Sequence, residues 1–287
     1  MKMKYFIWLI FIACVFFGCS PVAKTDKNTV FVTIEPLRYL TEQIAGPEWE
    51  VLTMVPEGSS PETYDPSPVQ LVQLSGSRAF FAVGYLGFEM HWLDNLKENA
   101  KGVSFYSTGE GVQLIEGHHH HHDDDDEEEG VDPHIWTTPK NALQMARNIC
   151  SAFCQMDPDH AEDYQHNLID LEKTLMQTDS AIRQQCAQGV QQAFAIYHPS
   201  LTYFARDYGV QQICIEEDGK EPSPSQLKSL VKLCREKEVR TIFIQAEFNT
   251  QNAETLAKEI GAQLVPINPL SYDWNGQMLK IIQSLKP

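Results

Sequence analysis

The sequence predicts an α/β protein with two α/β lobes, each built on a mostly parallel sheet and joined by a long rigid helix. Three observations support this fold class. Short apolar runs alternate with helical patterns in both halves of the 287-residue chain. A helical stretch without strand signals separates the two halves. Hydrophobic residues make up 43% of the chain, enough to fill substantial cores.

The first half predicts a lobe over residues 29–140. Its apolar runs are short and bounded by turn residues, as in strands, and the helical patterns between them indicate βαβ units. Gly46 is the expected end of the first helix. The expected strands are 29–34, 50–55, 79–84 and 103–107, and the expected helices are 37–46, 67–77 and 89–99.

Residues 141–189 predict connecting helices, and residues 190–287 predict the second lobe. One helix is expected over 141–156, stopped by Asp157-Pro158, and a longer one from about 159 to 188. Its apolar stripe is Tyr164, Leu168, Leu171, Leu175, Ile182 and Cys186. At 1.5 Å per residue it would be roughly 45 Å long, enough to brace two lobes. The second lobe has expected strands at 193–198, 211–216, 241–246 and 262–267, and expected helices at 201–209, 223–239 and 250–261.

The N-terminus predicts export and lipid anchoring. Lys2 and Lys4 precede an apolar run over residues 5–17, which is shorter than a typical membrane-spanning helix. The ending FFGC resembles a bacterial lipobox, which implies a signal peptide over 1–18, lipidation of Cys19 and a tether over 19–28. An ordinary signal peptide or an anchor helix is the alternative. Either way, we expect a protein of the cell envelope, on the periplasmic or extracytoplasmic side.

The net charge of −17 argues against a nucleic-acid partner, because phosphates would be repelled. Seven of these negative charges lie in GHHHHHDDDDEEEG, residues 117–130, within the first lobe. A purification tag is improbable there, because tags sit at termini and do not continue into an acidic run. A solvated loop is expected, since nothing apolar is present to fold it. We favour a weak metal-collecting role beside the cleft over a simple spacer, because clustered imidazoles bind Zn²⁺ and Cu²⁺. The histidines are His118, His119, His120, His121 and His122.

Two further histidines occupy positions where open α/β sheets bind ligands, beyond the carboxyl ends of strands. His198 ends an expected strand before Pro199, and His134 lies in DPHIW before the central helices. Glu62 lies in a proline-rich loop after another strand. Two imidazoles and a carboxylate form a normal set of ligands for Zn²⁺, and Mn²⁺ and Fe²⁺ also accept them. Surface positions are expected for His160 and His166 on the long helix, and a partly buried packing position for His91.

Several segments, in order, resemble the zinc and manganese solute-binding proteins that feed ABC importers, most closely the zinc-uptake branch. They are GSSPETYDPSP, DPHIWTTPKNA, YHPSLTYFARDYG, GKEPSPSQL and IFIQAEFNTQNAETLAKEIGAQLVPINPL. The resemblance covers essentially the whole mature chain. It implies two lobes, a connecting helix, a metal site in the interlobe cleft and a membrane permease as partner. The expected cargo is Zn²⁺, with Mn²⁺ or Fe²⁺ as the alternative.

Carried over by position, the resemblance makes His134 and His198 metal ligands. The sequence departs from the family at two places. Glu62 stands where the family usually has histidine, and Asn268 stands where it has aspartate. Glu247 and Asp273 are nearby candidates for a further oxygen ligand.

A metal-dependent hydrolase is the competing class, since the same three residues could hold a metal-bound water. The sequence contains no HExxH, HxxEH or GxSxG motif, which disfavours it. A surface adhesin, a role attributed to some relatives, is neither supported nor excluded. We therefore expect a binding protein and not an enzyme.

Overall fold

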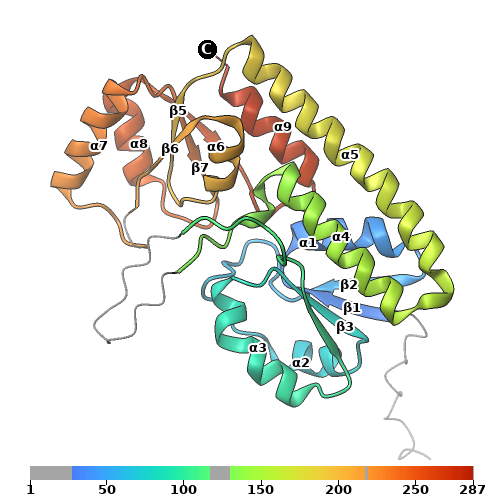
Figure 1. The fold of residues 1–287 in the computed structure, drawn as a ribbon. Helices are drawn as coiled ribbons and strands as arrows, with labels where there is room; N and C mark the ends of the chain where they lie inside the picture. The colour runs from blue at the N-terminus through green and yellow to red at the C-terminus, as the bar shows by residue number, and fades with distance from the viewer. Residues whose placement is uncertain (1–27, 117–129, 217–218, 287) are drawn as a thin grey trace, which may run out of the picture.

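Two parallel sheets form the two lobes of the protein (Figure 1). The computed structural model describes residues 28–116, 130–216 and 219–286. The first sheet has the strand order β2-β1-β3-β4, and the second has the equivalent order β6-β5-β7-β8. All the strand pairs within these two sheets are parallel. The expected fold class is confirmed.

The N-terminal lobe alternates strands and helices as expected. Its elements are β1 (Asn28–Val32), α1 (Glu35–Ala45), β2 (Trp49–Thr53), α2 (Pro68–Ser75), β3 (Ala79–Ala82), α3 (Gly87–Asn99) and β4 (Ser104–Ser107). Gly46 ends α1 with a φ of 72°, a conformation that favours glycine. β1 begins at Asn28, one residue inside the segment assigned to the tether.

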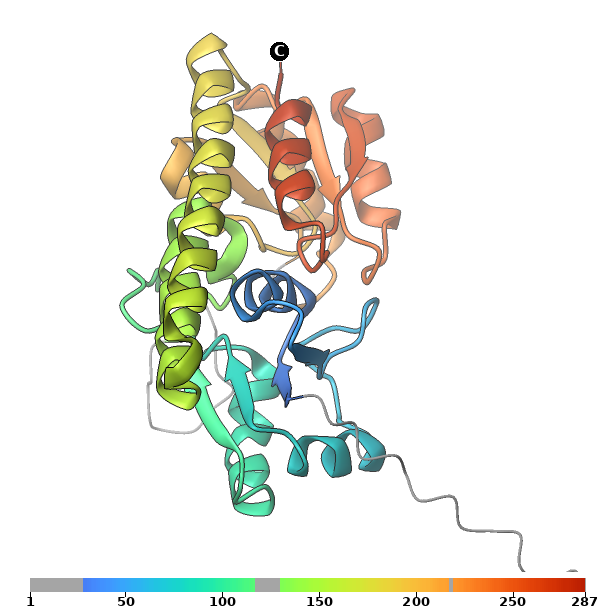
Figure 2. The same cartoon turned by 90° about the vertical axis from the view of Figure 1, so that its right-hand side faces the viewer.

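The central segment is helical. It contains the short 3₁₀ helix η1 (Ile135–Thr137), α4 (Pro139–Met156), the 3₁₀ helix η2 (Pro158–His160) and α5 (Ala161–Gln188). Figure 2 shows α5 running past both lobes, and it packs on α4, α1 and α9. Its buried residues include Tyr164, Leu171, Leu175 and Ile182 from the expected stripe.

The C-terminal lobe contains β5 (Ala193–Ile196), α6 (Thr202–Tyr208), β6 (Gln211–Cys214), α7 (Pro224–Glu236), β7 (Thr241–Ile244), α8 (Gln251–Ile260), β8 (Gln263–Pro266) and α9 (Trp274–Ser284). α9 was not among the helices predicted from the sequence. It buries Trp274, Met278, Ile281 and Ile282, which lie on one helical face.

One hydrophobic core is shared by both lobes. It includes Phe31 and Phe81 of the first sheet, Leu175 of α5, and Phe194 and Phe243 of the second sheet. A smaller cluster lies between the second sheet and the α7–α8 pair, around Ile213, Cys234 and Leu256. The shared core and α5 together fix how the two lobes face each other.

His91 is exposed, so its expected packing position is wrong. It lies on the outer face of α3, where its Nδ1 donates to the carbonyl of Gly87 at 2.7 Å. His166 is exposed on α5 as expected. His160 is also exposed, but it ends η2 just before α5 begins.

Some expectations concern residues outside the described ranges: the signal peptide, Cys19, most of the tether and the histidines 118–122. Among the helices that are described, none has the length and apolar character needed to span a membrane.

Candidate metal centre

Three side chains from three separate segments bring metal-binding atoms together. One atom each from Glu62, His134 and His198 lies within 4.8 Å of the others. Glu62 follows β2, His134 immediately precedes η1, and His198 follows β5. The strand order reverses between β1 and β3 in the first sheet and between β5 and β7 in the second. In α/β folds, ligands usually bind in the loops that follow the carboxyl ends of the strands at such a reversal.

Glu62 is held between its own loop and the start of α3. Its backbone N–H donates to Ser60 Oγ at 3.3 Å. Gly87 lies so close that a Cβ there would be 2.7 Å from Glu62 Oε2, so a side chain at position 87 would displace the carboxylate. Glu62 Oε1 is buried and has no hydrogen-bond partner. A buried carboxylate oxygen without a partner is costly, and a cation beside the two histidines would satisfy it.

His134 is fixed by Asp132. One oxygen of Asp132, Oδ1, accepts from both the backbone N–H and Nδ1 of His134, each at 2.9 Å. Tyr203 in turn donates its hydroxyl to the carbonyl of Asp132 at 2.7 Å. Burial works to lower the pKa of His134, but the hydrogen bond and the charge of Asp132 outweigh it and the pKa is raised. Burial works to raise the pKa of Asp132, but the hydrogen bond from His134 outweighs it and the pKa is lowered.

His198 is fixed by groups of the C-terminal lobe. Its Nδ1 lies 2.7 Å from Glu216 Oε1. Gln245 accepts from the backbone N–H of His198 at 3.3 Å and donates to its carbonyl at 3.2 Å. The ring of Phe248 stacks on the imidazole with centroids 4.8 Å apart.

Both imidazoles therefore present the same nitrogen to the cavity. Each Nδ1 pairs with a carboxylate, which favours the tautomer with its proton on Nδ1 and a lone pair on Nε2. The two Nε2 atoms lie 3.1 Å apart. Metal-binding histidines are typically held in this way by an outer carboxylate. The arrangement suits a cation that bridges the two nitrogens and Glu62.

The space at these residues is small, about 30 Å³. That is room for one or two water-sized occupants. The cavity is lined by Ser60, Pro61, Glu62, His134, Trp136, His198, Ser200, Gln245, Glu247, Phe248, Pro269 and Leu270.

The other candidate oxygen ligands lie differently. Glu247 lines the cavity but is not part of the three-residue group. Asp273 does not line it, because its carboxylate accepts from Gly276 N–H at 3.1 Å and caps α9. Asn268 is also turned to its own loop, where its Oδ1 accepts from Leu270 N–H at 2.9 Å. Sequence reasoning missed Asp132 and Glu216; the DPH motif contained Asp132, but no local signal marked Glu216.

The two lobes, the helix that joins them and the small cavity of nitrogen and oxygen donors define a solute-binding protein of the metal-ion class. The family model "ZnuA: Zinc-uptake complex component A periplasmic" matches residues 30–286. The chain belongs to this family.

Relatives of known sequence and structure agree. The high-affinity zinc uptake system protein ZnuA of Bacillus subtilis is 29% identical over 260 residues, covering 88% of this chain and 81% of that protein. The zinc-binding lipoprotein AdcA of Streptococcus pneumoniae is 27% identical over 281 residues, which are 93% of this chain but 56% of AdcA. A crystal structure of ZnuA superposes with a TM-score of 0.83 at 33% identity, covering 90% of this chain and 97% of that one.

Proposed function

We propose that this protein captures Zn²⁺ outside the cytoplasm and delivers it to the membrane permease of an ABC importer. Glu62, His134 and His198 are the proposed ligands, with Glu247 or water completing the shell. The observation that carries the proposal is the convergence of two carboxylate-supported Nε2 atoms on the unpartnered oxygen of Glu62. Membership of a zinc-uptake family supports it.

Binding without catalysis is the role that the cavity supports. A hydrolase would bind its substrate beside a metal-bound water, whereas a space of about 30 Å³ beside the three side chains matches the size of a single ion. The nitrogen-rich ligand set favours Zn²⁺, while a carboxylate in place of a third histidine brings the site closer to what Mn²⁺ and Fe²⁺ accept. We propose Zn²⁺ as the principal cargo.

Two parts of the proposal concern the residues outside the described ranges. We propose that Cys19 carries a lipid that anchors the mature protein to a membrane. We also propose that His118–His122 collect cations weakly near the cleft. The name of the AdcA relative as a lipoprotein supports the first of these.

A competitive titration of the mature protein with Zn²⁺ and Mn²⁺ tests the proposal. One tight zinc site is expected, and it should survive deletion of residues 118–129 while weaker sites disappear. His134→Ala or His198→Ala should weaken the tight site about 100-fold or more, since even outer partners of ligands are worth about 10- to 100-fold. His166→Ala, an exposed histidine on α5, is the matched control and should change nothing.

Loss of all tight binding on deletion of 118–129 would place the site in the histidine run and contradict the cleft assignment. Tighter binding of Mn²⁺ than of Zn²⁺ would keep the transport role and change the cargo. Turnover of phosphate or peptide esters by the zinc-loaded protein would favour the hydrolase class.

A further inference from the structure

Glu216 lies between the metal cavity and a separate groove on the outside of the C-terminal lobe. Its side chain is only 6% exposed, and Oε1 contacts His198 Nδ1 at 2.7 Å. We infer that Glu216 is a positioning residue for the metal: it holds His198 in the tautomer that presents Nε2 to the ion. This inference rests on the proposed function, because His198 must be a ligand for it to hold.

The hydrogen bond to Glu216 acts on the ring and not on the backbone. The main chain of His198 is held independently by Gln245, through both its N–H and its carbonyl. Phe248 restrains the plane of the ring by stacking. Removing the Glu216 carboxylate would therefore leave the ring near its place but free the Nδ1 proton to move to Nε2, where it blocks the metal.

Asp132 cannot be used to isolate the same effect at His134. Its Oδ1 also accepts from the backbone N–H of His134, and its carbonyl accepts from Tyr203. A substitution of Asp132 would therefore disturb the loop as well as the imidazole. A substitution of Glu216 can change the tautomer of His198 without changing the hydrogen bonds that hold its main chain.

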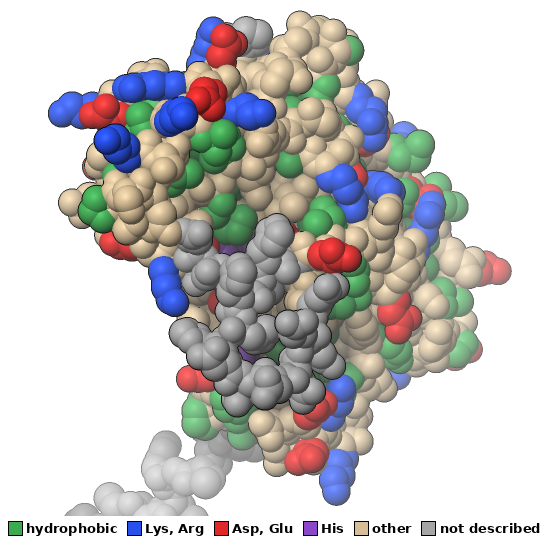
Figure 3. Space-filling model, turned by 60° about the vertical axis from the view of Figure 1, so that its left-hand side comes forward, with side chains coloured by type: hydrophobic (Ala, Val, Ile, Leu, Met, Phe, Trp, Pro, Cys, Tyr) green, Lys and Arg blue, Asp and Glu red, His purple; other side chains and the backbone are tan. Residues whose placement is uncertain are grey.

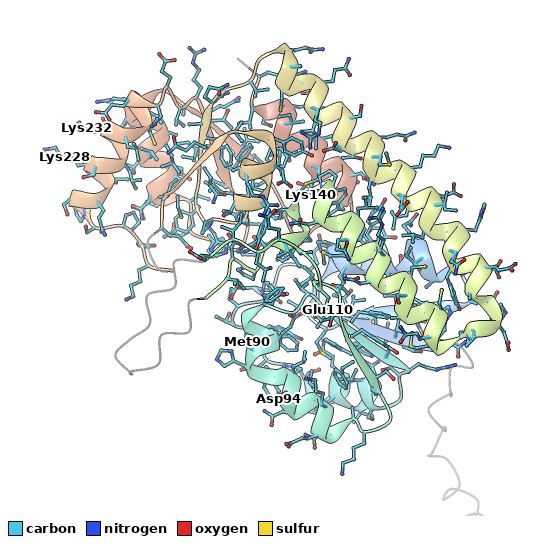
Figure 4. The ribbon with its side chains drawn as sticks, in the orientation of Figure 1. Met90, Asp94, Glu110, Lys140, Lys228 and Lys232 are labelled. Atoms are coloured by element: carbon cyan, nitrogen blue, oxygen red, sulfur yellow. The ribbon has the colours of Figure 1, made fainter. Side chains whose placement is uncertain are left out.

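The outer groove gives access to Glu216 from a side that does not pass through the metal cavity. It lies between the end of β6 and α7, has a volume of about 550 Å³, and is far larger than a formate ion. Its lining consists of Cys214, Ile215, Glu216, Pro222, Ser225, Gln226, Ser229, Leu230 and Leu233. Figure 4 shows Lys228 and Lys232 on the outer side of α7, and Figure 3 shows Lys and Arg side chains gathered over this upper part of the molecule. Among the described residues that line the groove, Glu216 is the only charged one.

This geometry allows chemical rescue. Glu216→Ala should weaken the binding of Zn²⁺ and Co²⁺ about 10- to 100-fold, the usual effect of removing an outer partner of a metal-binding histidine. Formate added to Glu216→Ala should occupy the vacated carboxylate position, accept from Nδ1 and raise the affinity of the variant about threefold or more, together with restoring the visible absorption of the Co²⁺ complex. Glu216→Gln should be weakened and not rescued, because its amide fills that position and its N–H can donate a hydrogen bond to Nδ1, which favours the tautomer with the proton on Nε2.

Asp157→Asn is the matched control. Asp157 also pairs with a histidine, its Oδ2 lying 2.9 Å from His160 Nδ1, and neither residue lines the metal cavity. The Asp157 carboxylate also accepts from Tyr164 at 2.8 Å, and the amide oxygen of asparagine can keep that bond. Asp157→Asn should leave metal affinity unchanged, with or without formate. Formate should also leave the wild-type protein and His198→Ala unaffected.

The outcomes separate the two levels of the proposal. If the wild type binds neither Zn²⁺ nor Co²⁺ tightly, the proposed function is wrong, and so is the role inferred for Glu216. If the wild type binds tightly and Glu216→Ala binds equally well, only the inference about Glu216 is wrong. If Glu216→Ala loses affinity and stability together and formate restores neither, Glu216 is a structural residue and not a positioning one.

Discussion

At the scale of single residues, His134 pairs with Asp132, and a proton would compete with the proposed metal for His134. The pKa of His134 is raised above 6.5 because Asp132 outweighs its burial, and the pKa of Asp132 is lowered below 3.8 by its hydrogen bond from His134. In the metal-free protein, the raised pKa contributes stability that is fully present below pH 6.5 and is lost as the pH rises through the folded pKa. The lowered pKa of Asp132 contributes stability that is present above pH 3.8 and is lost as the pH falls through its folded pKa.

Zinc affinity should follow the opposite trend. Because His134 accepts a proton more readily than an ordinary histidine, affinity should already fall between pH 8 and pH 6, while the metal-free protein gains stability over the same range. Titration with Zn²⁺ and urea unfolding at pH 8, 7, 6 and 5 measure the two trends. His134→Ala, which removes the group whose pKa is raised, should flatten the stability trend. An affinity that stays constant from pH 8 to pH 5 would rule out histidine ligation.

The sequence could indicate the three proposed ligands but not the residues that hold them in place. His134, His198 and Glu62 follow strands or precede a helix within recognisable motifs, so their meeting at one cavity was predictable. In the sequence, Glu216 could be recognised only as the last residue of an expected strand. Its distance from His198 along the chain does not show that the pairing of β5 and β6 brings Glu216 Oε1 to 2.7 Å from His198 Nδ1. Hydrogen-bond partners across strands depend on register, which one sequence does not reveal.

At the scale of elements, α5 should contribute stability through one face only. Leu175 is 1% exposed within the shared core, while the next residue, Met176, is 63% exposed. Leu175→Ala should lower the free energy of unfolding by about 2–5 kcal/mol through lost burial and a cavity. Met176→Ala should change it by no more than about 0.5 kcal/mol. Urea unfolding of the two metal-free variants measures the difference, and equal effects would contradict the one-sided packing of the helix.

Most elements were predictable because their apolar periods are strong and their ends carry turn and capping residues. Ser67 and Ser223, for example, form capping boxes that begin α2 and α7 where the sequence placed them. α9 was not predicted because its N-terminal cap is Asp273, a carboxylate that in the sequence also resembled a metal ligand. A carboxylate at this position could serve either role, and only the folded chain shows that it accepts from the backbone N–H of Gly276.

At the scale of the whole molecule, the two lobes are tied together by reciprocal bonds near the metal cavity. Trp274 of the C-terminal lobe donates to the carbonyl of Trp136 at 2.7 Å, and Trp136 donates to the carbonyl of Pro269 at 2.8 Å. Tyr272 donates to Glu42 of α1 at 2.6 Å. From these bonds, the shared core and α5, we expect only small relative movements of the lobes. Metal capture therefore acts on a molecule whose lobes are already joined.

We expect such a molecule to unfold as one unit despite its length. Far-UV circular dichroism follows the helices of both lobes, while tryptophan fluorescence includes Trp136 and Trp274 at their junction. In urea, the two signals of the metal-free protein should give one coincident transition, although chains above about 150 residues often do not. Zn²⁺ at 100 times its dissociation constant should add about 2.7 kcal/mol to the free energy of unfolding and move both signals together, because the proposed ligands His134 and His198 come from different lobes. Separate transitions, or a zinc shift seen by only one signal, would show that the lobes unfold independently and that the ion stabilises one of them alone.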